Sequence, residues 1–223
     1  MFDLKKVPIP NYSRTEDMVN SITHAPGAVF AIVAMIMCFK KAGPDRTGVQ
    51  TAAFIIYGVC MFILYFGSAY YHGRHPGFVK QVARVIDHSN VFLMITGTLS
   101  AYYLLGVMPV KYGIGLALFI LSWVITAVGI LLTFMDQERF KKIQMVMYLV
   151  LGWSAAFVLK SVWTLKDNGR EFVLYILIGG IVYTDGAILY GIGKKVPYIH
   201  AVFHIFILAG TILQFCGIYL YAI

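Results

Sequence analysis

The sequence predicts an all-α membrane protein that forms one bundle of seven transmembrane helices. Of its 223 residues, 60% are hydrophobic and only 13% are charged, and the mean hydropathy is +0.78. Soluble domains carry about 25% charged residues, so this composition is typical of an integral membrane protein. The apolar residues also fall in runs of about 20, the length that an α-helix needs to cross the hydrocarbon core of a bilayer. We therefore expect a multi-pass integral protein of the cell membrane.

Short polar connections separate the seven apolar runs. Pro44 and Pro197 lie in such connections, where the missing backbone N–H of proline breaks no helical hydrogen bond. Short connections between consecutive helices favour a compact antiparallel bundle, so we expect residues 1–223 to form a single domain. The polar residues 1–18 are expected to form a cytoplasmic tail before the first helix. The predicted transmembrane segments are 22–39, 49–72, 86–106, 112–133, 143–163, 172–192 and 199–222.

The distribution of positive charge predicts the orientation. With seven segments, the amino-terminal tail and the second, fourth and sixth connections share one side, which holds eleven Lys and Arg against seven on the other. Positively charged loops stay in the cytoplasm, so we expect a cytoplasmic amino terminus and an external carboxyl terminus. Because the cations lie in short loops and form no basic groove, we expect the lipid bilayer and no nucleic acid as a partner. The eleven are Lys5, Lys6, Arg14, Arg74, Lys80, Arg84, Arg139, Lys141, Lys142, Lys194 and Lys195.

Two histidines open the last predicted segment, in the stretch Tyr198-Ile-His-Ala-Val-Phe-His204. His200 and His204 are four residues apart, so in a helix both imidazoles lie on one face about one turn apart, as a single metal ion requires. Ionisable residues inside a membrane segment are costly and usually functional. The alternative is that each histidine hydrogen-bonds a neighbouring helix or lies at the interface beside Lys194 and Lys195.

Alternation of the segments brings further polar residues to the same membrane face. The second segment ends at that face, and the third and seventh begin there. Three histidines and one open position are typical of a catalytic zinc site, because a closed shell of four ligands leaves no place for substrate. We therefore predict a Zn²⁺ site with His72, His200 and His204 as ligands. The residues expected on this face are Ser68, His72, Asp87, His88, His200 and His204.

Asp87 and Ser68 are the predicted catalytic residues beside the metal. A carboxylate near a zinc-bound water can take its proton and pass it to a leaving group, and a hydroxyl can orient that water or bind the substrate carbonyl. Alternatively, Asp87 caps its helix or pairs with Arg84, and Ser68 bonds its own helix. His88 and His75 are expected at the interface or in a loop, although either can replace His72 as a ligand.

Three other ionisable residues are singled out by position. His24 and Glu16 lie near the start of the first segment, on the predicted metal face, where they can line or gate the site. Asp185 lies some eight residues inside the sixth segment. An uncompensated aspartate at that depth costs about 2.5 kcal/mol or more, so we expect Asp185 to have a partner or to face a water-filled cavity.

The motifs together resemble a known family. The SxxxH pattern of Ser68 and His72, the following Asp87, and the HxxxH pattern of His200 and His204 are similar to the hemolysin III-like branch of the progestin and adipoQ receptor family. The resemblance covers essentially the whole chain. It implies a seven-helix fold with an internal amino terminus, zinc bound by the three histidines, and the serine and aspartate beside it.

The resemblance also suggests a reaction. The family is further similar to alkaline ceramidases, which implies hydrolysis of a lipid amide. Asp185 departs from the apolar or small residue of the family pattern. We therefore expect a zinc-dependent hydrolase that acts on a membrane lipid or fatty-acyl substrate, through a ceramide-like amide or an ester bond.

Three alternatives remain for the function. The first is a non-enzymatic receptor or regulator of the membrane state in which zinc is structural. The second is a transporter that uses Asp87 and Asp185 as a proton relay. The third is a cytolysin, which the absence of an evident signal peptide and of an amphipathic strand pattern argues against.

Overall fold

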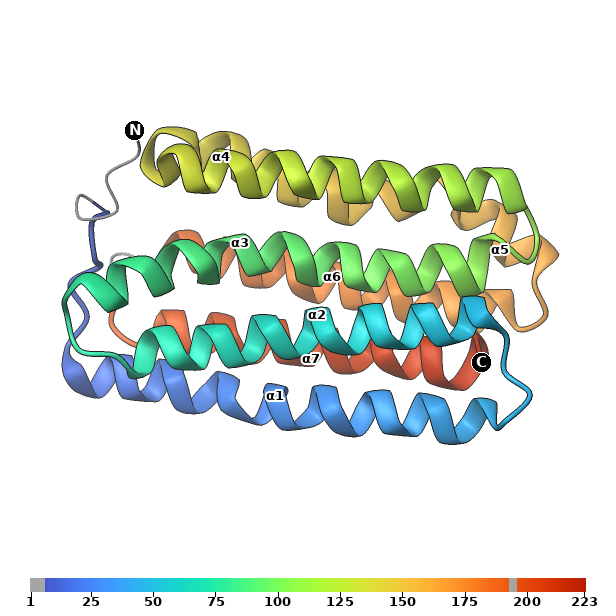
Figure 1. Ribbon diagram of the computed structural model, residues 1–223, viewed down its shortest axis with the longest axis horizontal. Coiled ribbons are helices and arrows are strands. Elements are labelled where there is room, and N and C mark those ends of the chain that lie inside the picture. The colour runs from blue at the N-terminus through green and yellow to red at the C-terminus, as the bar shows by residue number, and fades with distance from the viewer. Residues whose placement is uncertain (1–6, 193–195) are drawn as a thin grey trace.

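The protein is an elongated bundle of helices whose axes run side by side (Figure 1). The computed structural model describes residues 7–192 and 196–223, and all regular structure in them is helical. A π-helical segment, Tyr102–Val107, extends α3, and a 3-10 segment, Ser154–Val158, joins α4 to α5. The helices are α1 (Arg14–Ala42), α2 (Gly48–Gly73), α3 (Phe78–Ala101), α4 (Tyr112–Trp153), α5 (Leu159–Leu165), α6 (Gly169–Ile192) and α7 (Ile199–Tyr221).

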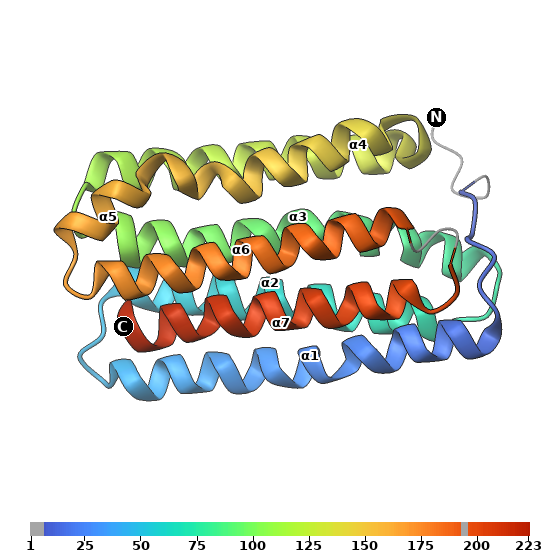
Figure 2. The ribbon, with the colours of Figure 1, turned by 180° about the vertical axis from the view of Figure 1, so that it is seen from behind.

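Six helical stretches of the described residues are long and apolar enough to cross a membrane, and not the seven that we predicted. The difference lies in Tyr112–Thr164, a stretch of 53 residues that contains the predicted segments 112–133 and 143–163. A straight helix of that length would measure about 80 Å, against about 30 Å for the hydrocarbon core. Figures 1 and 2 show that the ribbon of α4 crosses the bundle and then turns back.

The turn inside α4 is centred on Asp136. Its backbone leaves the helical region, with φ −165° and ψ 94°, and two helices meet across this kink. The Asp136 Oδ1 atom accepts a hydrogen bond of 3.0 Å from the backbone N–H of Arg139. Asp136 therefore caps the second half of α4, as aspartate commonly does at a helix start. The polar connection predicted between residues 133 and 143 is thus almost entirely helical.

The first helix begins inside the predicted polar tail. Ser13 caps α1, because its Oγ atom accepts a hydrogen bond of 3.2 Å from the Glu16 N–H. The last residues of the predicted polar tail, from Arg14 on, are therefore helical. Residues 1–6, with Lys5 and Lys6, and residues 193–195, with Lys194 and Lys195, lie outside the described part of the chain.

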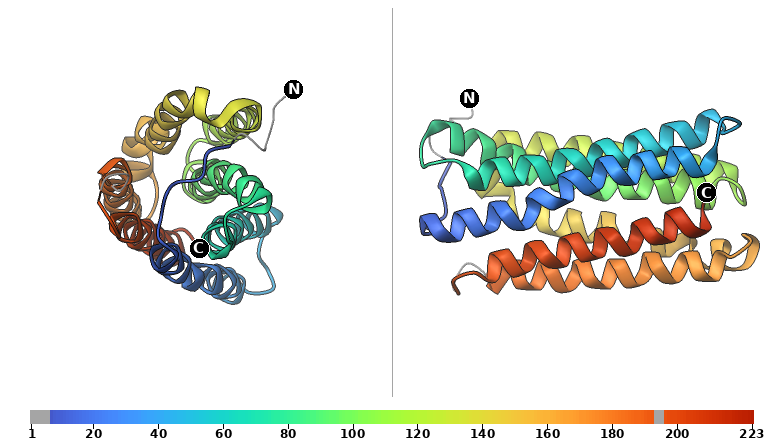
Figure 3. Two further views of the ribbon diagram at one scale, coloured as in Figure 1. Left: turned by 90° about the vertical axis from the view of Figure 1, so that its left-hand side faces the viewer. Right: turned by 90° about the horizontal axis from the view of Figure 1, so that it is seen from below.

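The helices follow one another around the bundle in the order of the chain, as the end-on view shows (Figure 3, left). Helix α1 packs against α2 and also against α7, which closes the ring. Close approach of α1 and α2 depends on Gly27, where an added Cβ would lie 2.3 Å from the Tyr65 ring. The end of α2 and the starts of α1, α3 and α7 lie together at one end of the bundle (Figure 1).

Candidate metal centre

Three buried histidines meet at this end of the bundle. His72 lies in the last turn of α2, and His200 and His204 lie in the first turns of α7. Each offers a ligand atom, and these three atoms lie within 4.8 Å of one another. His75, in contrast, is exposed between α2 and α3. The structure thus brings together the three histidines that the sequence predicts as ligands.

The distance between two of these histidines fits a shared metal ion. The Nε2 atoms of His72 and His200 are 3.3 Å apart. Two nitrogen ligands at about 2.0–2.1 Å from a tetrahedral Zn²⁺ are separated by about 3.3–3.4 Å. Two nitrogen lone pairs repel at this distance, so either a proton or a metal ion has to lie between them. The donor set of three imidazoles suits zinc.

The other nitrogens of two ligands are held by α1. The His72 Nδ1 atom lies 3.2 Å from Asp17 Oδ1, and His204 Nδ1 lies 3.0 Å from the backbone oxygen of Asn20. Both partners are acceptors, so Nδ1 of each ring carries the proton. Metal-binding histidines are commonly oriented in this way, because the arrangement leaves the Nε2 lone pair for the metal.

Sequence reasoning did not identify Asp17, which pairs with a buried lysine. Lys80 Nζ donates to Asp17 Oδ2 and, at 3.2 Å, to the backbone oxygen of Arg74. The Lys80 side chain is 1% exposed, so both charges are removed from water. Their mutual attraction offsets part of the cost of this desolvation. From the sequence alone, Lys80 is only one of the positive charges in the second connection. Carboxylates are common in the first turn of a helix, where they interact favourably with the helix dipole, so nothing in the local sequence indicates that Asp17 contacts His72.

Asp87 and Ser68 lie beside the histidines. The Asp87 side chain is 16% exposed, and the Ser68 hydroxyl lies close to its carboxylate. Arg84 pairs instead with Glu138, at 3.1 Å, and also donates to the backbone oxygen of Pro8. Among the described residues, Asp87 and Arg84 form no ion pair, which disfavours the purely structural reading of Asp87.

Two other predicted residues take structural positions. Glu16 accepts a hydrogen bond of 3.0 Å from the Tyr198 N–H and so fixes the start of α7. His88 Nδ1 lies 3.0 Å from the Arg84 backbone oxygen, and the His88 ring borders the cavity described below.

Asp185 contradicts our expectation. It is exposed on the outer side of α6, between the exposed Ile181 and Ile188. Within the described residues it has no ion pair, and it does not line the cavity. A proton relay that joins it to Asp87 therefore has no support in the packing.

A cavity of about 1010 Å³ adjoins the three histidines, Asp87 and Ser68. It also contacts Leu99, which follows Asp87 on α3 by twelve residues, or about 18 Å of helix. The cavity thus extends from the polar end of the bundle well into its apolar interior. Its apolar lining includes Leu64, Met94, Ile95, Leu99, Ile176 and Ile207.

The segment before α1 lines the polar end of this cavity. Pro8 and Tyr12 line it, and the Tyr12 ring stacks on His200 with centroids 5.5 Å apart. Gln81 Nε2 donates to the backbone oxygen of Val7 at 3.1 Å and helps to hold the segment on α3. Burial raises the pKa of the Tyr12 hydroxyl above its usual value, with a smaller contribution from Tyr190. The hydroxyl is therefore protonated at neutral pH.

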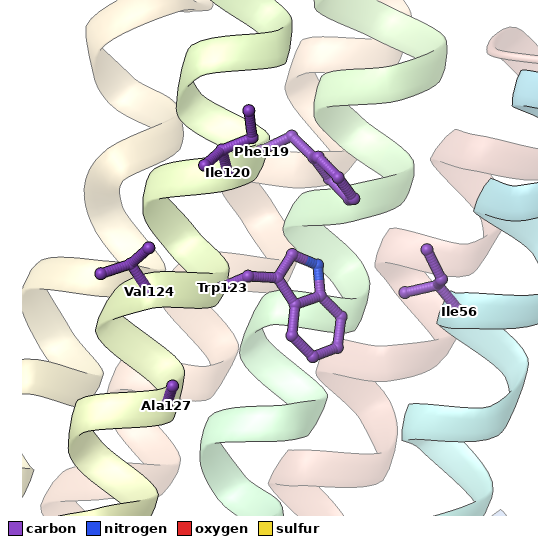
Figure 4. Close-up of a pocket in the computed structure, with 6 residues that line it drawn as sticks. All are labelled: Ile56, Phe119, Ile120, Trp123, Val124 and Ala127. Carbon is purple, nitrogen blue, oxygen red and sulfur yellow. The ribbon is translucent and has the colours of Figure 1, made fainter.

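A second hollow, on the outside of the bundle, has a different character. It is an apolar groove of about 420 Å³ between α2 and α4 (Figure 4). Its lining contains no carboxylate, histidine or cysteine, so it has no group for acid–base or metal chemistry. The lining residues are Ile56, Phe119, Ile120, Trp123, Val124 and Ala127.

Comparisons with known proteins identify the family. The family described as "Haemolysin-III related" matches residues 12–215. This chain belongs to the haemolysin-III-related family. It is 32% identical to "Hemolysin-3" of Bacillus cereus over 208 residues, 93% of this chain and 92% of that protein. It is also 32% identical to the "Hemolysin-3 homolog" of Bacillus subtilis (strain 168), over 93% of this chain and 95% of that one.

Similarity extends more weakly to an animal protein. The human "Monocyte to macrophage differentiation factor" is 23% identical over 211 residues, 92% of this chain and 84% of that protein. The resemblance to hemolysin III-like proteins is thus confirmed, and this haemolysin-III-related protein is a multi-pass integral membrane protein. The matched range contains all three histidines of the candidate metal centre as well as Asp17 and Asp87.

Proposed function

We propose that this haemolysin-III-related protein is a zinc-dependent hydrolase that cleaves an amide or ester bond of a membrane lipid. One observation carries the proposal. Three buried histidines, whose ligand atoms lie within 4.8 Å of one another, stand at the polar end of a long, largely apolar cavity, next to Asp87 and Ser68. A ceramide-like lipid fits this arrangement, because its amide group follows a long acyl chain.

The ligand set suits catalysis better than a purely structural metal. Among the described residues, no fourth histidine, cysteine or carboxylate belongs to the group of ligand atoms that lie within 4.8 Å of one another. Structural zinc sites usually have four protein ligands, and catalytic sites have three and an open position. When bound, zinc supplies Lewis acidity and lowers the pKa of a bound water to about 7.

The protein's own side chains then have separate roles. Asp87 is the general base, which accepts a proton from water and returns it to the leaving group. Ser68 holds the Asp87 carboxylate in place through its hydroxyl. Asp17 and the Asn20 backbone oxygen orient the rings of His72 and His204. The apolar wall of the cavity orients the acyl chain and keeps bulk water away from the bond.

We also propose seven crossings of the membrane with a cytoplasmic amino terminus. The kink at Asp136 divides α4 into two halves, and Figure 3 shows the halves side by side. The second crossing in this region would then continue from α4 into α5. This topology places the metal centre on the cytoplasmic side, where the loops hold more positive charge.

Release of fatty acid from defined lipids tests the proposed function. Purified, zinc-loaded protein in lipid nanodiscs is given C16 ceramide, diacylglycerol and phosphatidylcholine, and the released fatty acid is measured by mass spectrometry. We expect release from at least one lipid, and its loss on replacement of Asp87 by asparagine. No release from any of them, with zinc fully bound, would favour a receptor or regulator with a structural metal.

A further inference from the structure

His24, on α1, is a buried polar side chain next to the metal centre to which the mechanism above gives no role. The side chain is 3% exposed, and neither ring nitrogen has a hydrogen-bond partner of good geometry among the described residues, although the backbone of His204 lies close to the ring. A neutral imidazole has one donor and one acceptor nitrogen. Buried polar groups are nearly always paired, because an unpaired one costs the full price of desolvation. The unpaired ring therefore points to a ligand.

Two aromatic contacts fix the position of this ring. It stacks on His204, with centroids 3.6 Å apart and planes 20° apart. The His24 ring also makes a T-shaped contact with Tyr65, with ring centroids 5.1 Å apart and planes at 85° to each other. The close approach of Gly27 to Tyr65 holds α1 against α2 at this level. His24 also lines the cavity that contains His72, His200 and His204.

The stacking shows why His24 is not a further metal ligand. Imidazole binds a metal through a lone pair in the plane of the ring. The planes of His24 and His204 are nearly parallel and the ring centroids are 3.6 Å apart, so their lone pairs do not converge on one ion. The group of three ligand atoms within 4.8 Å accordingly excludes His24. The ring instead lines the same cavity as the three histidines.

We propose that His24 binds the carbonyl oxygen of the acyl group, as a hydrogen-bond donor in the cavity beside the three histidines. A carbonyl oxygen only accepts, and His24 supplies an unpaired N–H. An acyl bond that is cleaved at this centre has its carbonyl next to the histidines, and therefore next to His24. The inference rests on the proposed function, and it names the group that the site recognises in the substrate: an uncharged acyl carbonyl.

Two lipids that cannot be hydrolysed test this inference without any turnover. 2-Octadecanone and octadecane have the same chain length, carry no charge and differ only in a carbonyl group. Each lipid competes with a fluorescent fatty-acyl probe for zinc-loaded protein in nanodiscs. The ratio of the ketone and alkane dissociation constants is then compared between variants. Because each lipid partitions into the bilayer equally for all variants, partitioning cancels in this comparison. The variants are His24→Phe, which keeps the stacked ring without its nitrogens, His24→Gln, which keeps a donor, and His75→Phe as an exposed control.

We expect the wild type and His75→Phe to prefer the ketone, and His24→Phe to lose roughly five- to tenfold of that preference, the range of one hydrogen bond. His24→Gln retains part of it, and zinc content is the same in all variants. An unchanged preference in His24→Phe overturns the inference, and so does a wild type without preference. Loss of zinc from both His24→Phe and His24→Gln also overturns it, because His24 would then support His204.

The ketone competition assay and the hydrolysis assay can contradict their respective proposals independently of each other. If the wild type cleaves lipids but His24→Phe binds the ketone normally, only the role of His24 is wrong. If the preference depends on His24 but no lipid is cleaved, carbonyl recognition stands and the hydrolase proposal falls.

Discussion

His72 and Asp17 are joined by a contact of 3.2 Å between Nδ1 and Oδ1, although they are 55 residues apart in the chain. The other oxygen of the carboxylate is bound by Lys80. A carboxylate behind a metal-binding histidine fixes the orientation of its ring and raises its basicity. The metal centre therefore includes α1 and the start of α3 as well as the two helices that carry the ligands.

Replacement of Asp17 by asparagine should weaken zinc binding roughly 10- to 100-fold, because the amide removes the charge that supports His72. Zinc affinity is measured by competition with a chelator. Asp45→Asn, at an exposed position in the loop between α1 and α2, is the matched control and should bind zinc normally. The double variant Asp17→Asn/Lys80→Met removes the buried lysine that the first change leaves unpaired. Normal affinity in both Asp17 variants would contradict this role.

Removal of each proposed ligand should remove the metal. The wild type is expected to contain about one zinc per chain by elemental analysis, and His72→Ala, His200→Ala and His204→Ala should each contain much less, because two imidazoles hold zinc poorly. His75→Ala should keep its zinc, since that side chain is exposed and away from the three ligands. Full zinc content in all three ligand variants would rule out this centre.

Asp87→Asn should separate catalysis from metal binding. The substitution keeps the size of the side chain and removes its basicity, so we expect zinc content and thermal stability to be unchanged while fatty-acid release falls roughly 10²- to 10⁴-fold. Ser68→Ala should show a smaller loss, because it removes only the hydroxyl that holds the carboxylate. If Asp87→Asn loses its zinc instead, Asp87 helps to hold the metal, and the receptor alternative is then better supported than the hydrolase.

Labelling of single cysteines can show which side of the membrane each connection faces. In a background without Cys38, Cys60 and Cys216, a cysteine at Lys142 should react with an impermeant thiol reagent from the same side as one at His75. Asp45→Cys should react from the opposite side, because α1 and α2 meet there. With seven crossings, Lys142 and His75 face the cytoplasm, and a reporter that works only outside is active after Ile223. Labelling of Lys142→Cys and His75→Cys from opposite sides would refute the reversal at Asp136.

The apolar runs and the i,i+4 spacing of His200 and His204 are local properties of the chain, so the sequence predicted the helical membrane fold and the shared end of His72 and His204. The fourth and fifth predicted segments, in contrast, fall within the single apolar stretch Tyr112–Thr164. The helix that joins them was missed, because a run of charged residues after Asp136 is typical of a loop, yet an aspartate cap also starts a helix there.

By itself, the sequence determined which residue types are present, how they repeat along each helix, and hence which ends of the helices carry chemistry. Only the tertiary structure decided that Asp17 lies behind His72, that Lys80 is buried against it, and that His24 stacks on His204. These contacts join residues 55, 63 and 180 positions apart along the chain. Such contacts depend on the rotation and close packing of whole helices, as at Gly27 against Tyr65. A pattern of spacing within one helix does not contain that information.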